Sequence, residues 1–181
     1  TAKIPIGDGS YCYYPTASKR IYSNWGGTTI LDNNGTYSSI TQQNEFEGAI
    51  PFIPKELSQD GNTLYCSAGN NQIFRYTNVL SSPITKTIIT ISQMNNKRAS
   101  YIKVSPNNPS TIYIGTEDGR VIRLTNANTV PATPLAADIK QMVTGLYYVS
   151  SIDVKTDNTA PIQDDEIVVT CSNYGVASIY Y

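Results

Sequence analysis

The sequence predicts an all-β protein built from four copies of one paired-strand unit. Each copy has an apolar strand, a turn centred on glycine and a second strand, as in residues 19–31, 63–76, 111–124 and 167–181. The copies recur at a loose period of roughly 40–50 residues, and a single unit cannot bury both of its faces. This pattern is typical of β-propeller blades, so we expect about four blades, as part of a seven- or eight-bladed ring.

The predicted domain is one partial propeller over residues 1–181, with blades at about 10–43, 46–92, 98–140 and 147–181. The last blade is incomplete because its outer strand is missing from the pattern. We therefore expect its free face to be covered by the remainder of the propeller or by a second copy of the chain, since unpaired strands and apolar faces invite association.

The third copy shows the expected strand order most clearly. An alternating first strand at 100–105 is followed by a turn with two prolines, a second strand at 111–116 and a third at 120–125. The same order places the first strand of the second copy at 49–53. Residues 134–143 fit either a short helix or an outer strand with its loop.

Two tyrosines take the same place in neighbouring copies. Tyr65 and Tyr113 each follow the first apolar residue of a predicted middle strand. We expect both rings to be buried between adjacent sheets, because large aromatic side chains contribute most of their stabilisation when buried.

The composition excludes several functions. The chain has 13 Lys and Arg against 14 Asp and Glu, a net charge of −1, so it lacks the basic surface that nucleic acid requires. No apolar run reaches the roughly 18 residues of a membrane span. Histidine is absent, which removes the commonest general base and metal ligand. Three widely spaced cysteines make neither a disulfide framework nor a zinc site. We predict no metal and no cofactor.

Three segments carry a resemblance to a known family. Residues 104–116, Val-Ser-Pro-Asn-Asn-Pro-Ser-Thr-Ile-Tyr-Ile-Gly-Thr, resemble a blade phrase of BNR/Asp-box propellers of the sortilin and xyloglucanase kind. Residues 170–180 resemble a blade of large secreted Bacteroidetes proteins described as glycosyl hydrolases. Residues 32–37, Asp-Asn-Asn-Gly-Thr-Tyr, look like a degenerate Asp box, one residue too long and with Tyr for Trp. The resemblance covers most of residues 11–181.

The resemblance implies a bacterial protein that is secreted or lies at the cell surface. In this family the aspartate of the Asp box, here Asp32, accepts hydrogen bonds from turn amides and has a structural role. The function implied is that of a glycosyl hydrolase or BNR-repeat protein that acts on or binds polysaccharide. The alternative is a non-catalytic adhesion or scaffolding propeller that binds proteins or glycans.

Catalytic residues are not evident in the sequence. A glycosidase needs two carboxyl groups at a set separation, and we identify no such pair. Xyloglucanase-like enzymes carry a catalytic Asp-Ile-Gly-Gly turn where this chain has Glu117-Asp118-Gly119-Arg120, which fits an ordinary β-turn. Catalysis by the full-length protein stays open, and we expect no hydrolase activity from this segment. The acidic run 164–166 lacks the alternating spacing of a calcium loop and fits a solvated turn.

Sugar binding requires exposed aromatic faces beside polar groups. The candidate carbohydrate-binding residues are Trp25, Glu45, Glu47, Arg98, Tyr101, Tyr147 and Tyr148. Each lies beside a turn or at the entry to a predicted first strand. Trp25 also fits packing between blades, and the two glutamates also fit solvated loop charges.

Overall fold

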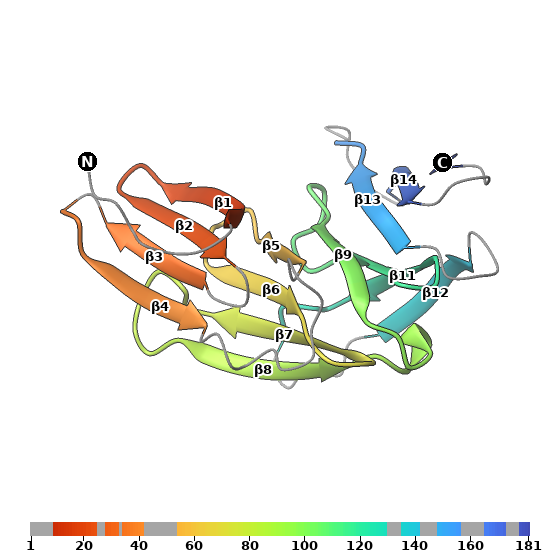
Figure 1. Ribbon diagram of the computed structural model, residues 1–181, viewed down its shortest axis with the longest axis horizontal. Helices are drawn as coiled ribbons and strands as arrows, with labels where there is room; N and C mark the ends of the chain where they lie inside the picture. The colour runs from red at the N-terminus through yellow and green to blue at the C-terminus, as the bar shows by residue number, and fades with distance from the viewer. Residues whose placement is uncertain are drawn as a thin grey trace.

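The computed structural model describes residues 9–24, 28–32, 34–41, 54–129, 135–141, 148–156, 165–172 and 178–181. Within these ranges the chain is all-β apart from one 3-10 turn, η2 (Ser92–Met94). The strands form four separate antiparallel sheets, and the strands of each sheet lie side by side in chain order (Figure 1). Every pairing is therefore between neighbours in the sequence.

The sheets follow one another along the chain. The first contains β1 (Gly9–Thr16), β2 (Lys19–Asn24), β3 (Thr28–Asp32) and β4 (Tyr37–Thr41). The second contains β5 (Lys55–Leu57), β6 (Thr63–Ser67), β7 (Gln72–Thr77) and β8 (Thr85–Thr90). The third contains β9 (Ala99–Val104), β10 (Ile112–Thr116), β11 (Arg120–Thr125) and β12 (Leu135–Gln141). The fourth contains β13 (Tyr148–Val154), β14 (Ile167–Ser172) and β15 (Ile179–Tyr180).

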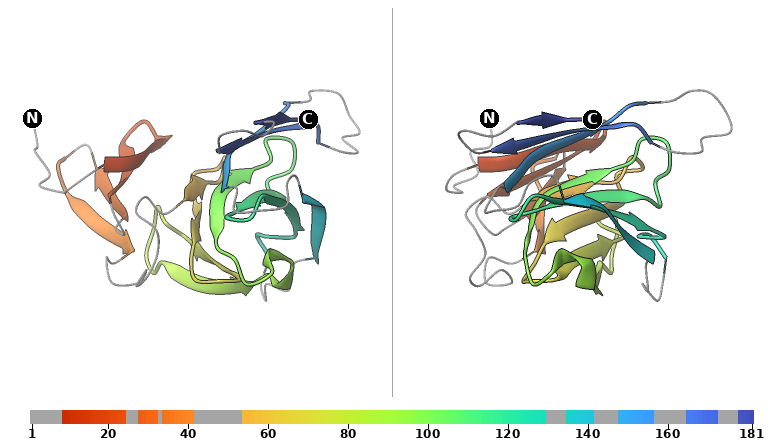
Figure 2. Two further views of the ribbon diagram at one scale, coloured as in Figure 1. Left: turned by 45° about the vertical axis from the view of Figure 1, so that its right-hand side comes forward. Right: turned by 90° about the vertical axis from the view of Figure 1, so that its right-hand side faces the viewer.

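The prediction of a β-propeller ring is wrong. The described strands make four separate sheets of three or four strands, and no closed ring is present among them. In Figure 2 (left) the first sheet lies at the left, and the fourth sheet lies above the third. The reason is physical: a strand–turn–strand repeat specifies local antiparallel pairing, but it does not specify that the last sheet returns to the first.

The sequence also predicts elements at residues 49–53 and 134–143. The first strand predicted at 49–53 lies outside the described residues, and the second sheet begins instead with β5. Of the two alternatives for residues 134–143, the outer strand is correct, because β12 pairs with β11 from Arg120↔Gln141 to Thr125↔Leu135.

Three apolar clusters lie between successive sheets. Ile21 and Ile30 of the first sheet share a cluster with Leu64, Cys66 and Phe74 of the second. A larger cluster, which includes Tyr65, Ile73, Ile102, Ile114 and Ile122, joins the second and third sheets. A third, which includes Tyr113, Val121, Val149, Ile152 and Val169, joins the third and fourth sheets. Tyr65 and Tyr113 are 0% and 2% exposed, as the sequence predicts.

The first strand of each sheet has one edge that pairs with no other described strand. Side chains of the neighbouring sheet bind carbonyl groups there. The hydroxyl of Tyr13 donates to the Lys55 carbonyl at 2.7 Å, and the hydroxyl of Ser67 donates to the Ala99 carbonyl at 2.8 Å. Between the third and fourth sheets, the hydroxyl of Ser100 donates to the Val149 carbonyl at 2.8 Å. These bonds satisfy polar groups that would otherwise be buried without a partner.

The sequence also leads to expectations about membrane spans and about the cysteines. Among the described residues, no helix is long and apolar enough to cross a membrane. All three cysteines are free thiols; Cys66 and Cys171 are buried and Cys12 is exposed.

The contact between the third and fourth sheets predicts a glycine requirement at position 115. A Cβ added at Gly115 would lie 2.4 Å from Cγ1 of Val149, so Gly115→Ala would force β10 and β13 apart. We expect a loss of about 1–3 kcal/mol in the free energy of unfolding. Gly69→Ala is the control, because its Cβ would meet only the Gln72 side chain at 3.8 Å. Urea titrations of both variants measure this, and equal midpoints would contradict it.

Candidate functional site

A groove of about 690 Å³ lies beside the strands of the fourth sheet, and we call it the outer groove. It is lined by Asp153, Lys155, Asp165, Glu166, Ile167, Val168 and Tyr181. These side chains come together because β13 and β14 are paired in the register Asp153↔Val168 and Val154↔Ile167.

The polar side chains of the outer groove are held in place by neighbours. The ammonium of Lys155 lies 3.0 Å from both carboxylate oxygens of Glu166. The carboxylate of Asp165 accepts hydrogen bonds from the Asn107 amide at 2.6 Å and from the Tyr113 hydroxyl at 2.8 Å. Burial and the bond to Asp165 both raise the pKa of Tyr113, so its hydroxyl stays protonated and donates. The groove is thereby fixed to the third sheet.

Apolar side chains are exposed beside these charges. The exposed fractions are 47% for Val168, 68% for Ile179, 104% for Tyr181 and 44% for Tyr148. Strand alternation and the pairings Tyr148↔Ser172, Asp153↔Val168 and Thr170↔Ile179 put these residues on the side of the sheet away from the buried cluster. We call this side the outer face of the fourth sheet. Exposed apolar residues grouped on one face mark an interaction surface.

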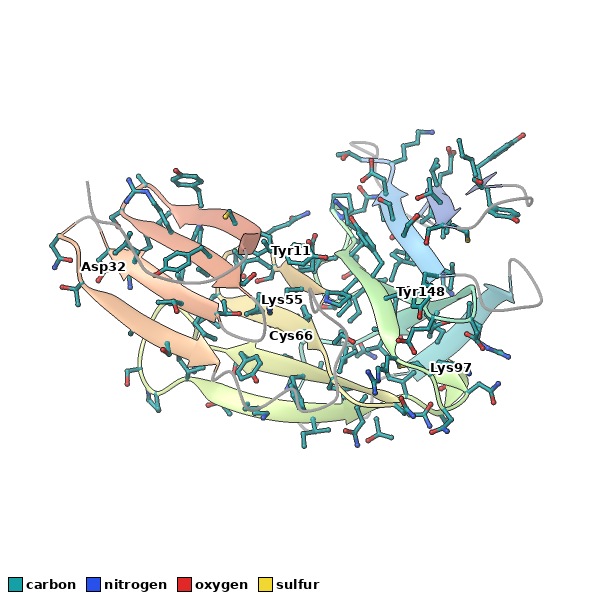
Figure 3. The ribbon with its side chains drawn as sticks, viewed as in Figure 1. Tyr11, Asp32, Lys55, Cys66, Lys97 and Tyr148 are labelled. Carbon is teal, nitrogen blue, oxygen red and sulfur yellow. The ribbon has the colours of Figure 1, made fainter. Side chains whose placement is uncertain are left out.

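A second polar group lies where the first strands β1, β5 and β9 approach each other, and we call it the first-strand cluster. It consists of Tyr11, Tyr13, Glu56, Tyr101 and Lys103. The rings of Tyr11 and Tyr13 stack with centroids 6.4 Å apart and planes 7° from parallel. The charge of Glu56 acts on the Tyr11 hydroxyl, and Figure 3 labels Tyr11 and Lys55, the neighbour of Glu56 in β5.

Burial dominates the electrostatics of this cluster. It raises the pKa of Glu56, while the ammonium of Lys103 and a hydrogen bond with the Val104 backbone act in the opposite direction. It also raises the pKa of Tyr13, with smaller contributions from Glu56 and Tyr11. The ammonium of Lys103 lies 3.5 Å from a carboxylate oxygen of Asp153, which connects the cluster to the outer groove.

The first-strand cluster has a structural role. A buried carboxyl with a raised pKa can transfer protons near neutral pH, which makes Glu56 a chemical candidate. However, Glu56 is hydrogen-bonded to the backbone of β9, and the Tyr13 hydroxyl is hydrogen-bonded to the backbone of β5. Because these side chains satisfy the free edges of first strands, we assign the cluster to holding the sheets together.

Four of the residues predicted to bind carbohydrate, Trp25, Glu45, Glu47 and Tyr147, lie outside the described residues. Arg98 precedes β9, where its backbone exchanges hydrogen bonds with the Glu117 turn. Tyr101 packs against the cluster between the third and fourth sheets, so much of its ring is covered. Tyr148 begins β13 on the outer face of the fourth sheet (Figure 3).

The predicted acidic turn is partly described. Asp164 lies outside the described residues, and Asp165 and Glu166 line the outer groove. Across the part of the chain that the structure describes, no group of three or more histidine, cysteine or acidic side chains could hold a metal ion.

Sequence reasoning missed Glu56 and Lys103 of the first-strand cluster and Asp153 and Val168 of the outer groove. Lys103 could have been found, because strand alternation in the predicted first strand 100–105 puts it on the face opposite Ile102. Glu56 could not, because Lys55-Glu56-Leu57 has the composition of an exposed loop. Asp153 and Val168 become neighbours only through the pairing of β13 with β14.

The chain matches no family model and no curated protein. Among solved structures, it resembles a provisionally named 6-phosphogluconolactonase from Bacteroides uniformis, with a TM-score of 0.53 and 16% sequence identity. The match covers 97% of this chain and 56% of that chain, so this chain spans little more than half of its neighbour. At this identity the likeness shows the fold alone.

These findings correct the descriptions that accompanied the propeller prediction. The fold resembles that of a protein provisionally named as a lactonase, and neither the described residues nor this likeness supports BNR repeats or carbohydrate binding. The turn at Asp32 shows why. The Asn34 side chain, not Asp32, accepts the turn amide of Thr36, at 3.0 Å, and the Asp32 carboxylate lies 4.0 Å from the Lys19 ammonium.

The raised pKa of Glu56 predicts a pH-dependent contribution to stability. A carboxyl whose pKa is higher in the folded than in the unfolded state stabilises the fold below its ordinary value of 4.5, and this contribution is lost as the pH rises through the folded value. Glu56→Gln cannot ionise. We therefore expect the variant to gain stability relative to the parent as the pH rises from about 4.5. Urea titrations across this pH range test it; a difference that is independent of pH would contradict it.

The bond between Tyr113 and Asp165 predicts a contrast between two tyrosine variants. Tyr113→Phe removes a donor to a carboxylate and should cost about 1.5–3 kcal/mol in the free energy of unfolding. Tyr65→Phe is the control, because the Tyr65 hydroxyl is buried and has no hydrogen-bond partner among the described residues. It should unfold at the same temperature as the parent or higher. Calorimetry measures both, and equal losses would refute the contrast.

Proposed function

We propose that this part of the chain is a non-catalytic scaffolding domain that binds another β-sheet on the outer face of its fourth sheet. The observation that carries the proposal is the outer groove, which Val168 lines and beside which Ile179 is exposed. A sheet face of this kind is stabilised when a second layer covers it, because a sheet buries its apolar side only against another element.

The existing sheet contacts support this proposal. Each of the three internal contacts buries an apolar cluster between the faces of successive sheets. The outer face of the fourth sheet continues that series, and Val168 is its central apolar residue. Asp153, which is paired with Val168 across the strands, has a side chain that is 79% exposed at the edge of the same surface.

The occupant that we propose is the first sheet of a second copy of the chain. Tyr14 of β1 is 76% exposed, and the guanidinium of Arg20 lies over its ring at 5.6 Å from the centroid. An exposed aromatic ring with a cation complements a face that carries apolar residues and carboxylates. Charge pairs at the rim would set the register of such a contact, and the apolar area would supply most of its free energy.

Other expectations from the sequence remain predictions. These are action on polysaccharide by the full-length protein and a location outside the cell or at the bacterial surface. The Bacteroides uniformis protein is provisionally named a 6-phosphogluconolactonase, and 16% identity gives no reason to assign that activity to this chain.

The proposal predicts self-association that depends on concentration. The parent chain should form dimers or larger assemblies in sedimentation velocity runs at increasing concentration. Val168→Asp should shift the equilibrium to monomer, because it places a charge at the centre of the contact. The matched control is Ile88→Asp on β8, an equally accessible apolar residue at 55% exposure that lies outside the outer groove.

A charge reversal identifies the partner face. Arg20→Glu should weaken association, and the double variant with Asp153→Arg should restore it in part. A parent chain that stays monomeric at high concentration would refute the proposal. So would an Ile88→Asp effect as large as that of Val168→Asp.

A further inference from the structure

A cavity of about 220 Å³ lies between the second and third sheets, away from the outer groove. It is lined by Ser58, Gln59, Asp60, Thr63, Tyr65, Pro109 and Asn128. Tyr65 is fully buried, and its hydroxyl has no hydrogen-bond partner among the described residues. A buried hydroxyl in this state costs free energy unless something in the cavity binds it.

A buried cation lies beside the same cavity. Arg75 is 0% exposed, and its Nη1 donates to the carbonyls of Ala127, at 2.6 Å, and Thr129. Its Nε and Nη2 have no hydrogen-bond partner within the described part of the chain. Two neutral carbonyls do not compensate for the desolvation of a guanidinium, which is normally buried only with an anion.

Two relations place this guanidinium next to residues that line the cavity. Arg75 is the cross-strand partner of Tyr65, so both side chains project from the same face of the second sheet. The two carbonyls bound by Nη1 belong to the residues on either side of Asn128, which lines the cavity. The charge of Arg75 also acts on Tyr65 and opposes the effect of burial, which raises the pKa of that hydroxyl to about 12. The hydroxyl is therefore a donor at neutral pH.

We propose that this cavity binds a small oxyanion, a carboxylate or a phosphate, held by the hydroxyl of Tyr65 in the cavity wall and attracted by the positive charge of Arg75 behind that wall. The charge of Arg75 acts strongly on an anion there, because water does not screen a buried guanidinium. The volume admits an anion with a few additional atoms. This site is independent of the proposed scaffolding role, because it lies between the second and third sheets.

The carboxylate of Asp60 weakens the binding of anions in the cavity. Its carboxylate accepts hydrogen bonds from the Ser58 hydroxyl and from the backbone N–H of Asn62, the latter at 3.0 Å, and it lies in the cavity wall. A negative group there repels an anion, and it repels a dianion more than a monoanion. Asp60→Asn should therefore tighten binding.

The experiment measures the melting temperature of the parent chain with sodium phosphate or sodium acetate, against sodium chloride at the same ionic strength. We expect the melting temperature to rise with at least one of the two oxyanions, to saturate with its concentration and to stay flat with chloride. A response to acetate alone identifies a carboxylate site, and a response to phosphate alone identifies a phosphate site.

Two variants make the test specific. Tyr65→Phe should fold as well as the parent but bind the oxyanion about tenfold more weakly, since it lacks a hydrogen bond to a charged group. Asp60→Asn should bind it more tightly than the parent. The proposal is overturned if neither oxyanion raises the melting temperature beyond chloride, or if Tyr65→Phe responds as strongly as the parent.

Discussion

The free edges of the first strands are the constraint on which the other contacts between sheets depend. β1, β5, β9 and β13 each pair with one strand only, so half of their backbone groups need other partners. Side chains of an adjacent sheet supply some of them: Tyr13 for Lys55, Ser67 for Ala99 and Ser100 for Val149. A hydrogen bond satisfied in this way fixes the separation of two sheets, and the apolar clusters then fill the space between them. The close approach of Gly115 to Val149 is one result.

How much of this follows from the sequence depends on whether an element is determined locally. The hairpins of the third sheet and the burial of Tyr65 and Tyr113 follow from strand alternation and glycine turns, which are local signals. β5 does not, because Lys55 and Glu56 have the composition of a loop, yet burial shifts the pKa of both, and Glu56 interacts with Lys103 and Val104 of the third sheet. The arrangement of the sheets in space also could not be predicted from the sequence. The residues of a hairpin determine the pairing of its own strands, but not the number or the placement of the other sheets. The outer groove and the cavity between the second and third sheets are formed by residues that are far apart in the sequence. Their proximity could not be predicted from local sequence patterns.

The two proposed sites differ in the physics of their charges. In the outer groove, charged groups lie near solvent and pair with each other, as Lys155 does with Glu166. Such pairs contribute little stability, and their main effect is on which partner fits and in which register. Arg75 is fully buried, so water does not screen its charge. A ligand anion there would replace solvation that the folded chain does not supply, which is why the two sites call for different probes.

The chain order of the strands also has a consequence for biosynthesis. Because each sheet is made of consecutive strands, all the residues of one sheet leave the ribosome before the next sheet begins. Contacts of short sequence separation form quickly, and each completed sheet provides a surface for the one that follows. The chain can therefore assemble vectorially from its N-terminal end during translation, and exposure of unpaired strands is confined to the sheet being synthesised.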